Sequence, residues 1–144
     1  MTLAAAVTAS LGCGGQPLES SNQSSHVRGT AYRLRAVDGA VLPTRFTPLQ
    51  DPQPAPAVRI DSGQITFHAD GKATGEWHGT GEMTSVSRVF QAAYVEHGSR
   101  VLIYTADDAP PDTADVLDNT MSVRAQFYRP SSRERYVVVM TYAR

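Results

Sequence analysis

The chain contains very little cysteine, and this limits how its fold can be stabilised. Cys13 is the only cysteine among 144 residues, so no disulfide can form within the chain. A chain of this length can bury enough apolar surface to fold without such cross-links. We therefore expect one domain that is held together by its own core.

The chain also lacks an excess of charge of either sign. Its formal net charge is −1 at pH 7, whereas proteins that bind nucleic acid usually present a basic patch or stripe. We therefore expect no nucleic-acid partner.

The first residues read as an export signal. Residues 1–12 are uncharged and mostly small and apolar, and they run directly into Cys13. Such a run matches the apolar core of a secretory signal and is too short to span a bilayer. The junction Ser10-Leu11-Gly12-Cys13 resembles the lipobox of bacterial lipoproteins. This resemblance implies that Cys13 is acylated, becomes the mature N-terminus and anchors the protein to the membrane.

The segment departs from the lipobox pattern in two ways. Ser10 stands where an aliphatic residue is usual, and no Lys or Arg precedes the apolar run, which suggests that the true start codon lies upstream. The alternative is a first strand that contains a buried or free thiol at Cys13. An Ala-rich, Gly-flanked sequence has a low propensity to form a β-strand, however.

A polar, Gly/Ser-rich segment follows the cysteine and predicts a flexible tether. We divide the chain into a signal peptide at 1–12, a lipidated cysteine with its tether at 13–27, and a folded domain at 28–144. The expected location is the cell envelope. Gly14, in place of Asp, favours the outer membrane over the inner one.

The domain alternates apolar and polar residues with a period of two, and no window of a dozen residues sustains a helical stripe. This pattern predicts an all-β fold of antiparallel, half-buried strands. We expect about eight strands, near residues 30–37, 40–46, 57–69 (with a break at Ser62-Gly63), 72–78, 85–95, 100–106, 119–128 and 134–143.

Two turns predict the strand register. At 69–71, a three-residue loop with Gly71 in the left-handed conformation would pair Phe67 with Ala73, which keeps apolar residues on one face. At His97-Gly98, a two-residue loop would pair Tyr94 with Val101.

An up-and-down meander of about eight strands can close into a small barrel, and closure would remove its exposed edges. We expect long loops at 48–56 and 106–119, with a short helical turn at 112–117. The segments Tyr32–Pro43 and Ser62–Gly71 resemble small secreted bacterial lipoproteins with lipocalin-like β-barrels. This resemblance implies an architecture but no particular ligand.

The sequence does not fit the known patterns of catalytic or metal-binding sites. Gly98-Ser99 lacks the flanking pattern of a nucleophile elbow and His26 lies in the tether, so we expect no enzyme activity. His78 is expected opposite Ser62, roughly 20 Å from His68, too far to share a metal ion. Five aspartates between 107 and 118 lack the spacing of a calcium loop. We expect no metal and no cofactor.

Two strands, 101–104 and 136–140, are apolar on both faces. This indicates that a loop, a second copy or a partner covers their outer surface.

Two classes of function remain open. In one, the barrel is filled by its own side chains and the protein is a non-enzymatic interaction or structural module of the envelope. Its expected partner surface is Arg33, Arg35, Arg133 and Arg135, which would be neighbours if the first and last strands pair.

In the other class, the barrel is a carrier of one small apolar ligand. The residues expected to line its interior are Tyr32, Leu34, Phe67, Trp77, Phe90 and Phe127. We favour the first class, because short strands with medium-sized inward side chains leave little space.

Overall fold

The computed structural model describes residues 27–46, 58–81, 85–106, 109–129 and 134–144, and this part of the chain is built from ten β-strands. None of its segments is a helix that could cross a membrane. The strands are β1 Ala31–Val37, β2 Ala40–Val41, β3 Thr44–Phe46, β4 Val58–Phe67, β5 Lys72–Thr80, β6 Ser85–His97, β7 Arg100–Tyr104, β8 Asp112–Leu117, β9 Thr120–Arg129 and β10 Glu134–Ala143.

Eight of these strands close into an antiparallel ring, which confirms the predicted all-β barrel. Strands β4 to β10 follow one another as hairpin neighbours, β10 pairs with β1, and β1 pairs with β4. Strands β2 and β3 are additions to the borders of β1 and β4. The result is compatible with a lipocalin-like fold.

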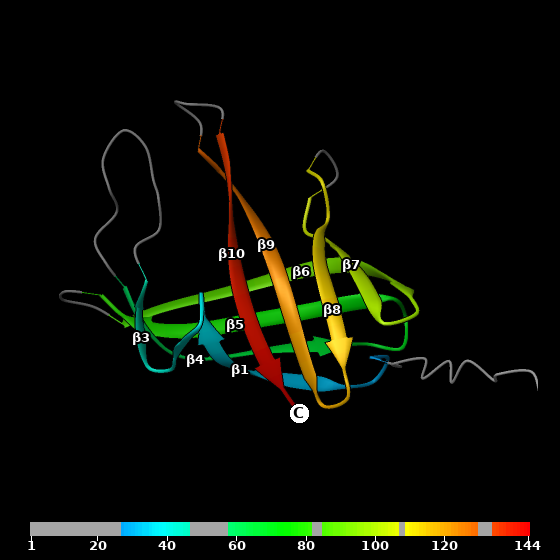
Figure 1. Cartoon of the computed structure of the whole chain (residues 1–144), viewed down its shortest axis with the longest axis horizontal. Coiled ribbons are helices and arrows are strands. Elements are labelled where there is room, and N and C mark those ends of the chain that lie inside the picture. Colours follow the sequence, from blue (N-terminus) through cyan, green and yellow to red (C-terminus); the bar gives the residue numbers. More distant parts are fainter. Residues whose placement is uncertain (1–26, 47–57, 82–84, 107–108, 130–133) are drawn as a thin grey trace, which may run out of the picture.

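The ring is flattened into two layers. Figure 1 shows β4, β5 and β6 running behind β8, β9 and β10, which cross them steeply. The inward faces of the two layers meet in the core.

Strand β1 joins the two layers because its halves have different partners. Ala31 and Tyr32 pair with β4, whereas Ala36 and Val37 pair with β10. The register with β10 shifts between Leu34 and Ala36, and such a bulge sharpens the local twist of a strand. This twist takes β1 from one layer to the other.

The predicted turn between β4 and β5 is confirmed. Phe67 pairs with Ala73, Ser62 lies opposite His78, and Gly71 has a φ of 82°. Glycine adopts this left-handed conformation without the clash that a Cβ would cause.

The predicted register between β6 and β7 is wrong by two residues. Tyr94 pairs with Ile103, not Val101, and the loop is Gly98-Ser99. Gly98 has a φ of 63°, and a glycine with positive φ at the first central position is typical of a type II′ hairpin turn. Because the shift is even, Tyr94 still points inward.

The helical turn expected at 112–117 is wrong, because these residues form β8. Ala114 and Val116 face the core, and Thr113 and Asp115 face outward. The expected strand at 40–46 is interrupted at Leu42-Pro43, where proline lacks the N–H that a ladder requires. The expected loop at 48–56 lies outside the described residues.

The core is apolar throughout the described part of the chain, where no polar or charged residue is buried. Its largest fully buried side chains are Tyr32, Phe67, Ile60, Ile65, Ile103, Met121, Val27 and Val101. Val27 lies one residue before the expected domain boundary, so the barrel includes the end of the expected tether.

Candidate binding site at the open end of the barrel

One end of the barrel is plugged by the segment that leads into β1. Val27 is fully buried, the Gly29 N–H donates to the Phe67 carbonyl at 2.7 Å, and the Phe67 N–H donates to the Thr30 carbonyl at 2.9 Å. Residues 27–30 are therefore fastened across the end of β4. No ligand can enter where these side chains and backbone bonds lie.

The C-terminal residue covers the same end. The Arg144 guanidinium donates to the Tyr32 hydroxyl from Nη2 at 2.8 Å and from Nε at 3.1 Å. It also lies 5.1 Å from the centre of the Tyr32 ring. The hydroxyl of a fully buried tyrosine thus has its partner, as a buried polar group requires.

Toward the opposite end, where Trp77 lies near the last residues of β5 and Tyr136 near the first residues of β10, apolar side chains remain half-buried. They pack against the core from β5, β6 and β10 and from the residue after β2. We call this set the open-end cluster: Leu42, Trp77, Phe90, Tyr136 and Met140. Its members pack against the core and remain partly accessible to solvent.

Two glycines in β4 and β5 position the aromatic members of the cluster. A Cβ at Gly75 would overlap the Phe90 ring, so this ring lies directly on the glycine backbone. Gly63 lies opposite Trp77, and a Cβ there would meet the Leu34 side chain at 3.1 Å. Gly63 thus faces the core, and its pairing confirms that Trp77 points inward.

Two polar groups lie beside the cluster. The Tyr142 hydroxyl donates to the Met140 sulfur at 3.6 Å. Burial, and then the nearby Asp112 carboxylate, raise the pKa of Tyr142 well above its ordinary value. Asp112 Oδ1 accepts a hydrogen bond of 2.7 Å from the Gln126 backbone N–H. Because β8 begins at Asp112, no residue of β8 pairs with Gln126. Desolvation by burial raises the pKa of Asp112, although this hydrogen bond lowers it.

We expect Asp112→Asn to flatten the pH dependence of stability. A carboxyl whose pKa is raised on folding stabilises the fold below its unfolded pKa near 3.8, and this contribution is lost as the pH rises through the folded value. The asparagine oxygen still accepts from Gln126 but carries no charge. Relative to the native protein, the free energy of unfolding of the variant should therefore rise between pH 3 and pH 7.

Urea titrations between pH 3 and pH 7 measure this difference. The control is Asp112→Ala, which leaves the Gln126 N–H without its acceptor and should lower the free energy of unfolding by about 1 kcal/mol. Parallel pH profiles for native protein and Asp112→Asn would contradict the assignment.

The six residues expected to line a ligand cavity lie in different parts of the structure. Tyr32, Leu34 and Phe67 are 0%, 6% and 0% exposed, so they fill the core. Trp77 and Phe90 belong to the open-end cluster. Phe127 pairs with Tyr136 in the ladder, and its side chain lies outside the described residues. Sequence reasoning had not singled out Leu42, Tyr136 and Met140 as site residues.

The expected arginine surface is not assembled as predicted. Strands β1 and β10 do pair, and Arg33, Arg35 and Arg135 are exposed. Arg33 lies opposite Ala143, however, eight residues along β10 from Arg135 and so roughly 26 Å away at 3.3 Å per residue. Arg133, like Cys13, lies outside the described residues.

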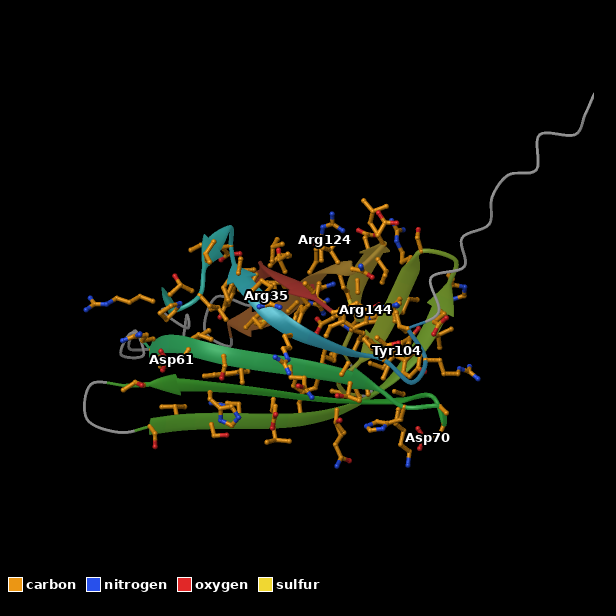
Figure 2. The ribbon with its side chains drawn as sticks, turned by 90° about the horizontal axis from the view of Figure 1, so that it is seen from below. Arg35, Asp61, Asp70, Tyr104, Arg124 and Arg144 are labelled. Carbon is orange, nitrogen blue, oxygen red and sulfur yellow. The ribbon has the colours of Figure 1, made fainter. Side chains whose placement is uncertain are left out.

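The outer face near Arg35 instead carries an ion-pair group. Asp115 of β8 is bonded by Arg124 of β9 and by Arg100 of β7, whose Nε lies 3.2 Å from the carboxylate. The hydrogen bond from Arg124, together with Arg100, lowers the pKa of Asp115. Figure 2 shows Arg35 and Arg124 on the layer opposite β4–β6. Exposed pairs of this kind contribute little to stability.

Two open hollows lie on the outside of the barrel. One, of about 230 Å³, is bordered by Gln64, Thr66, Thr74 and Glu76. The other, of about 290 Å³, is bordered by His68, Asp70, Lys72 and Gln91. These side chains alternate with the core residues of β4, β5 and β6. Both hollows therefore open to the outer face of the β4–β6 layer.

The histidines and acidic residues of the described segments form no group of three or more that could hold a metal ion. His68 Nε2 lies 2.9 Å from the Thr74 hydroxyl, and His78 Nε2 lies 3.8 Å from the Glu76 carboxylate. The two histidines thus have separate partners.

Comparisons with protein-family models, curated proteins and solved structures found no match to this chain. The fold and the open-end cluster are therefore the basis for any functional argument.

Proposed function

We propose that the protein is a non-enzymatic interaction module of the cell envelope, anchored through acylated Cys13, that offers the open-end cluster to another protein. The observation that carries this proposal is the contrast between the two ends of the barrel. One end is sealed by Val27 and Arg144, and the other keeps Trp77, Phe90 and Tyr136 half-buried. Aromatic residues with one accessible side are enriched in protein interfaces.

The direction of the chain supports this arrangement. Val27, which leads back to the expected tether, lies at the sealed end, opposite the open-end cluster. An anchor upstream of Val27 would therefore attach at the sealed end. The open end is then free to meet a partner.

The filled core favours an interaction module over a carrier. Tyr32, Phe67 and Ile65 are at most 1% exposed and occupy the inward positions that a deep ligand cavity would require. A carrier would have to hold its ligand at the open end alone. We therefore keep the carrier of a small apolar molecule as the alternative.

Site-specific photo-cross-linking in cells tests the proposed contact. A photoreactive amino acid in place of Trp77 is expected to give a cross-linked product with a different protein. The matched control is Leu117, which is 72% exposed at the end of β8 nearer the sealed end, and it should give none. Products from position 117 alone would contradict the proposal.

A titration with an apolar fluorescent probe separates the alternative. Trp77 is the only tryptophan, so its emission reports directly on the open end. Saturable probe binding at Trp77, together with no cross-linked protein, would assign the site to a carrier.

The anchor is tested separately by cell fractionation. The native chain should sediment with membranes and incorporate labelled fatty acid, and Cys13→Ser should do neither. Membrane association that survives this substitution would overturn the anchoring role.

A further inference from the structure

The barrel wall is incomplete beside β6. Strand β7 pairs only with residues 93–97 of β6, and β8 pairs with β7 and with the first part of β9. Residues 85–92 of β6 are paired with β5 on one side, and among the described residues no strand lies on the other. Figures 1 and 2 both show this half of β6 at the border of the β4–β6 layer.

The backbone groups at this border can be identified from the ladder. In an antiparallel sheet, successive residues direct their N–H and C=O groups alternately toward the two neighbouring strands. The Tyr94 N–H donates to the Gly71 carbonyl on the β5 side at 2.9 Å, so even-numbered residues of β6 face β5. Ser85, Ser87, Val89 and Gln91 therefore direct their backbone groups to the open border.

The side chains at this border do not shield it. Val89 is 70% exposed and is one of the most exposed large apolar residues of the described chain. Ser87, Arg88 and Gln91 are also exposed, and Phe90 is half-buried. Arg88 is the single charged side chain of residues 85–92. A long strand border with unpaired backbone groups is a template for a further strand.

We propose that the occupant of this border is the β6 strand of a second copy of the chain, paired antiparallel about a two-fold axis at Val89. Such an interface uses the same surface on both copies. It goes beyond the proposed function and does not depend on acylation of Cys13.

Self-complementarity selects this register. With Val89 opposite Val89 of the second copy, Ser87 lies opposite Gln91, so every residue with free backbone groups at the centre of the border gains a partner. Arg88 then lies opposite Phe90 of the second copy, where a guanidinium is attracted to an aromatic face. A two-fold axis at Arg88 would instead place two arginines opposite each other, which is unfavourable. An axis at Phe90 would pair Ser87 with Ala93, whose groups already bond β7.

The first test is disulfide cross-linking in the full chain with Cys13→Ser, which leaves no native thiol. A cysteine at position 89 would face its own copy with Cα atoms roughly 5.5 Å apart, a separation that a disulfide spans. The matched control is Val95→Cys, which is also outward-facing on β6 but lies opposite Leu102 of β7. Val89→Cys should form disulfide-linked dimer at least tenfold faster than the control.

The second test is sedimentation equilibrium in the same background. Val89→Lys places two ammonium groups opposite each other and should raise the dimer dissociation constant at least tenfold. Val137→Lys, on the 53% exposed side chain of β10, should leave it unchanged. Far-UV circular dichroism checks that both lysine variants keep the strand signal of the parent. If either variant loses this signal, the disulfide cross-linking of the cysteine variants decides between dimer and monomer.

Three results would overturn the proposal. They are a parent protein that remains monomeric at every concentration, equal cross-linking from positions 89 and 95, and a dissociation constant that Val89→Lys does not change.

Discussion

Replacing Phe67 by alanine is expected to lower the free energy of unfolding by about 4 kcal/mol, the largest loss we expect from one substitution. Phe67 is fully buried, and its ring meets Tyr94 edge-on at 5.0 Å and Tyr32 edge-on at 6.1 Å between centroids. Its backbone also holds residues 29 and 30 over the sealed end. Truncation removes buried apolar surface and leaves a cavity that the surrounding barrel cannot readily fill.

Urea unfolding of the full chain, followed by far-UV circular dichroism, measures this loss. The matched control is Val137→Ala, which shortens an exposed side chain and should change the free energy of unfolding by less than about 0.5 kcal/mol. A loss of under about 1 kcal/mol for Phe67→Ala would mean that the three rings do not form the centre of the core.

Gly79→Ala is expected to lower the free energy of unfolding by about 3 kcal/mol, because the added methyl group would collide with backbone. A Cβ at this position would overlap the Arg59 carbonyl oxygen of β4 and touch Val58. Neither can move without disturbing the β4–β5 ladder.

Gly75→Ala is the contrasting variant. The three atoms nearest its Cβ would all belong to the Phe90 ring, and this half-buried ring can move aside. We expect a smaller loss, about 1 kcal/mol, with a change in Trp77 emission. Equal losses for the two variants in thermal unfolding would contradict this distinction between backbone and side-chain neighbours.

The sequence predicts the β4–β5 hairpin to the residue because two constraints agree there. Gly71 supplies the left-handed conformation, and a shift of the register by one residue would move Ile65 and Phe67 to the face opposite Ala73. At the β6–β7 turn, registers that differ by two residues keep the same faces inward. The hydrophobic pattern could not choose between them, and the choice depended on whether Gly98 takes the first or second central position.

Strand β8 was missed because aspartate is depleted in strands and common in loops. The available signal was the alternation of Ala114 and Val116 with polar residues. Asp115 lies on the outer face of this strand, where Arg100 and Arg124 on the neighbouring strands bond its carboxylate. These partners are known only once the strands are paired.

The candidate site was predicted only in part, for the same reason. Alternation shows that Trp77 and Phe90 point inward, but not whether they are deep in the core or at its end. That depends on Val27 and Arg144, which seal the other end from opposite termini of the described chain. The open border of β6 likewise depends on how short β7 and β8 are.

The shared strand β1 sets the order in which the molecule can be assembled. Strands β4 to β10 are linked by successive hairpins, so each can add to its predecessor during synthesis. The bond from the Val139 N–H to Asp38 joins residues 101 positions apart, and contacts this distant in sequence are slow to form. Until β10 has left the ribosome, β1 can pair with β4 but not with β10. The barrel therefore cannot close before synthesis of the last strand.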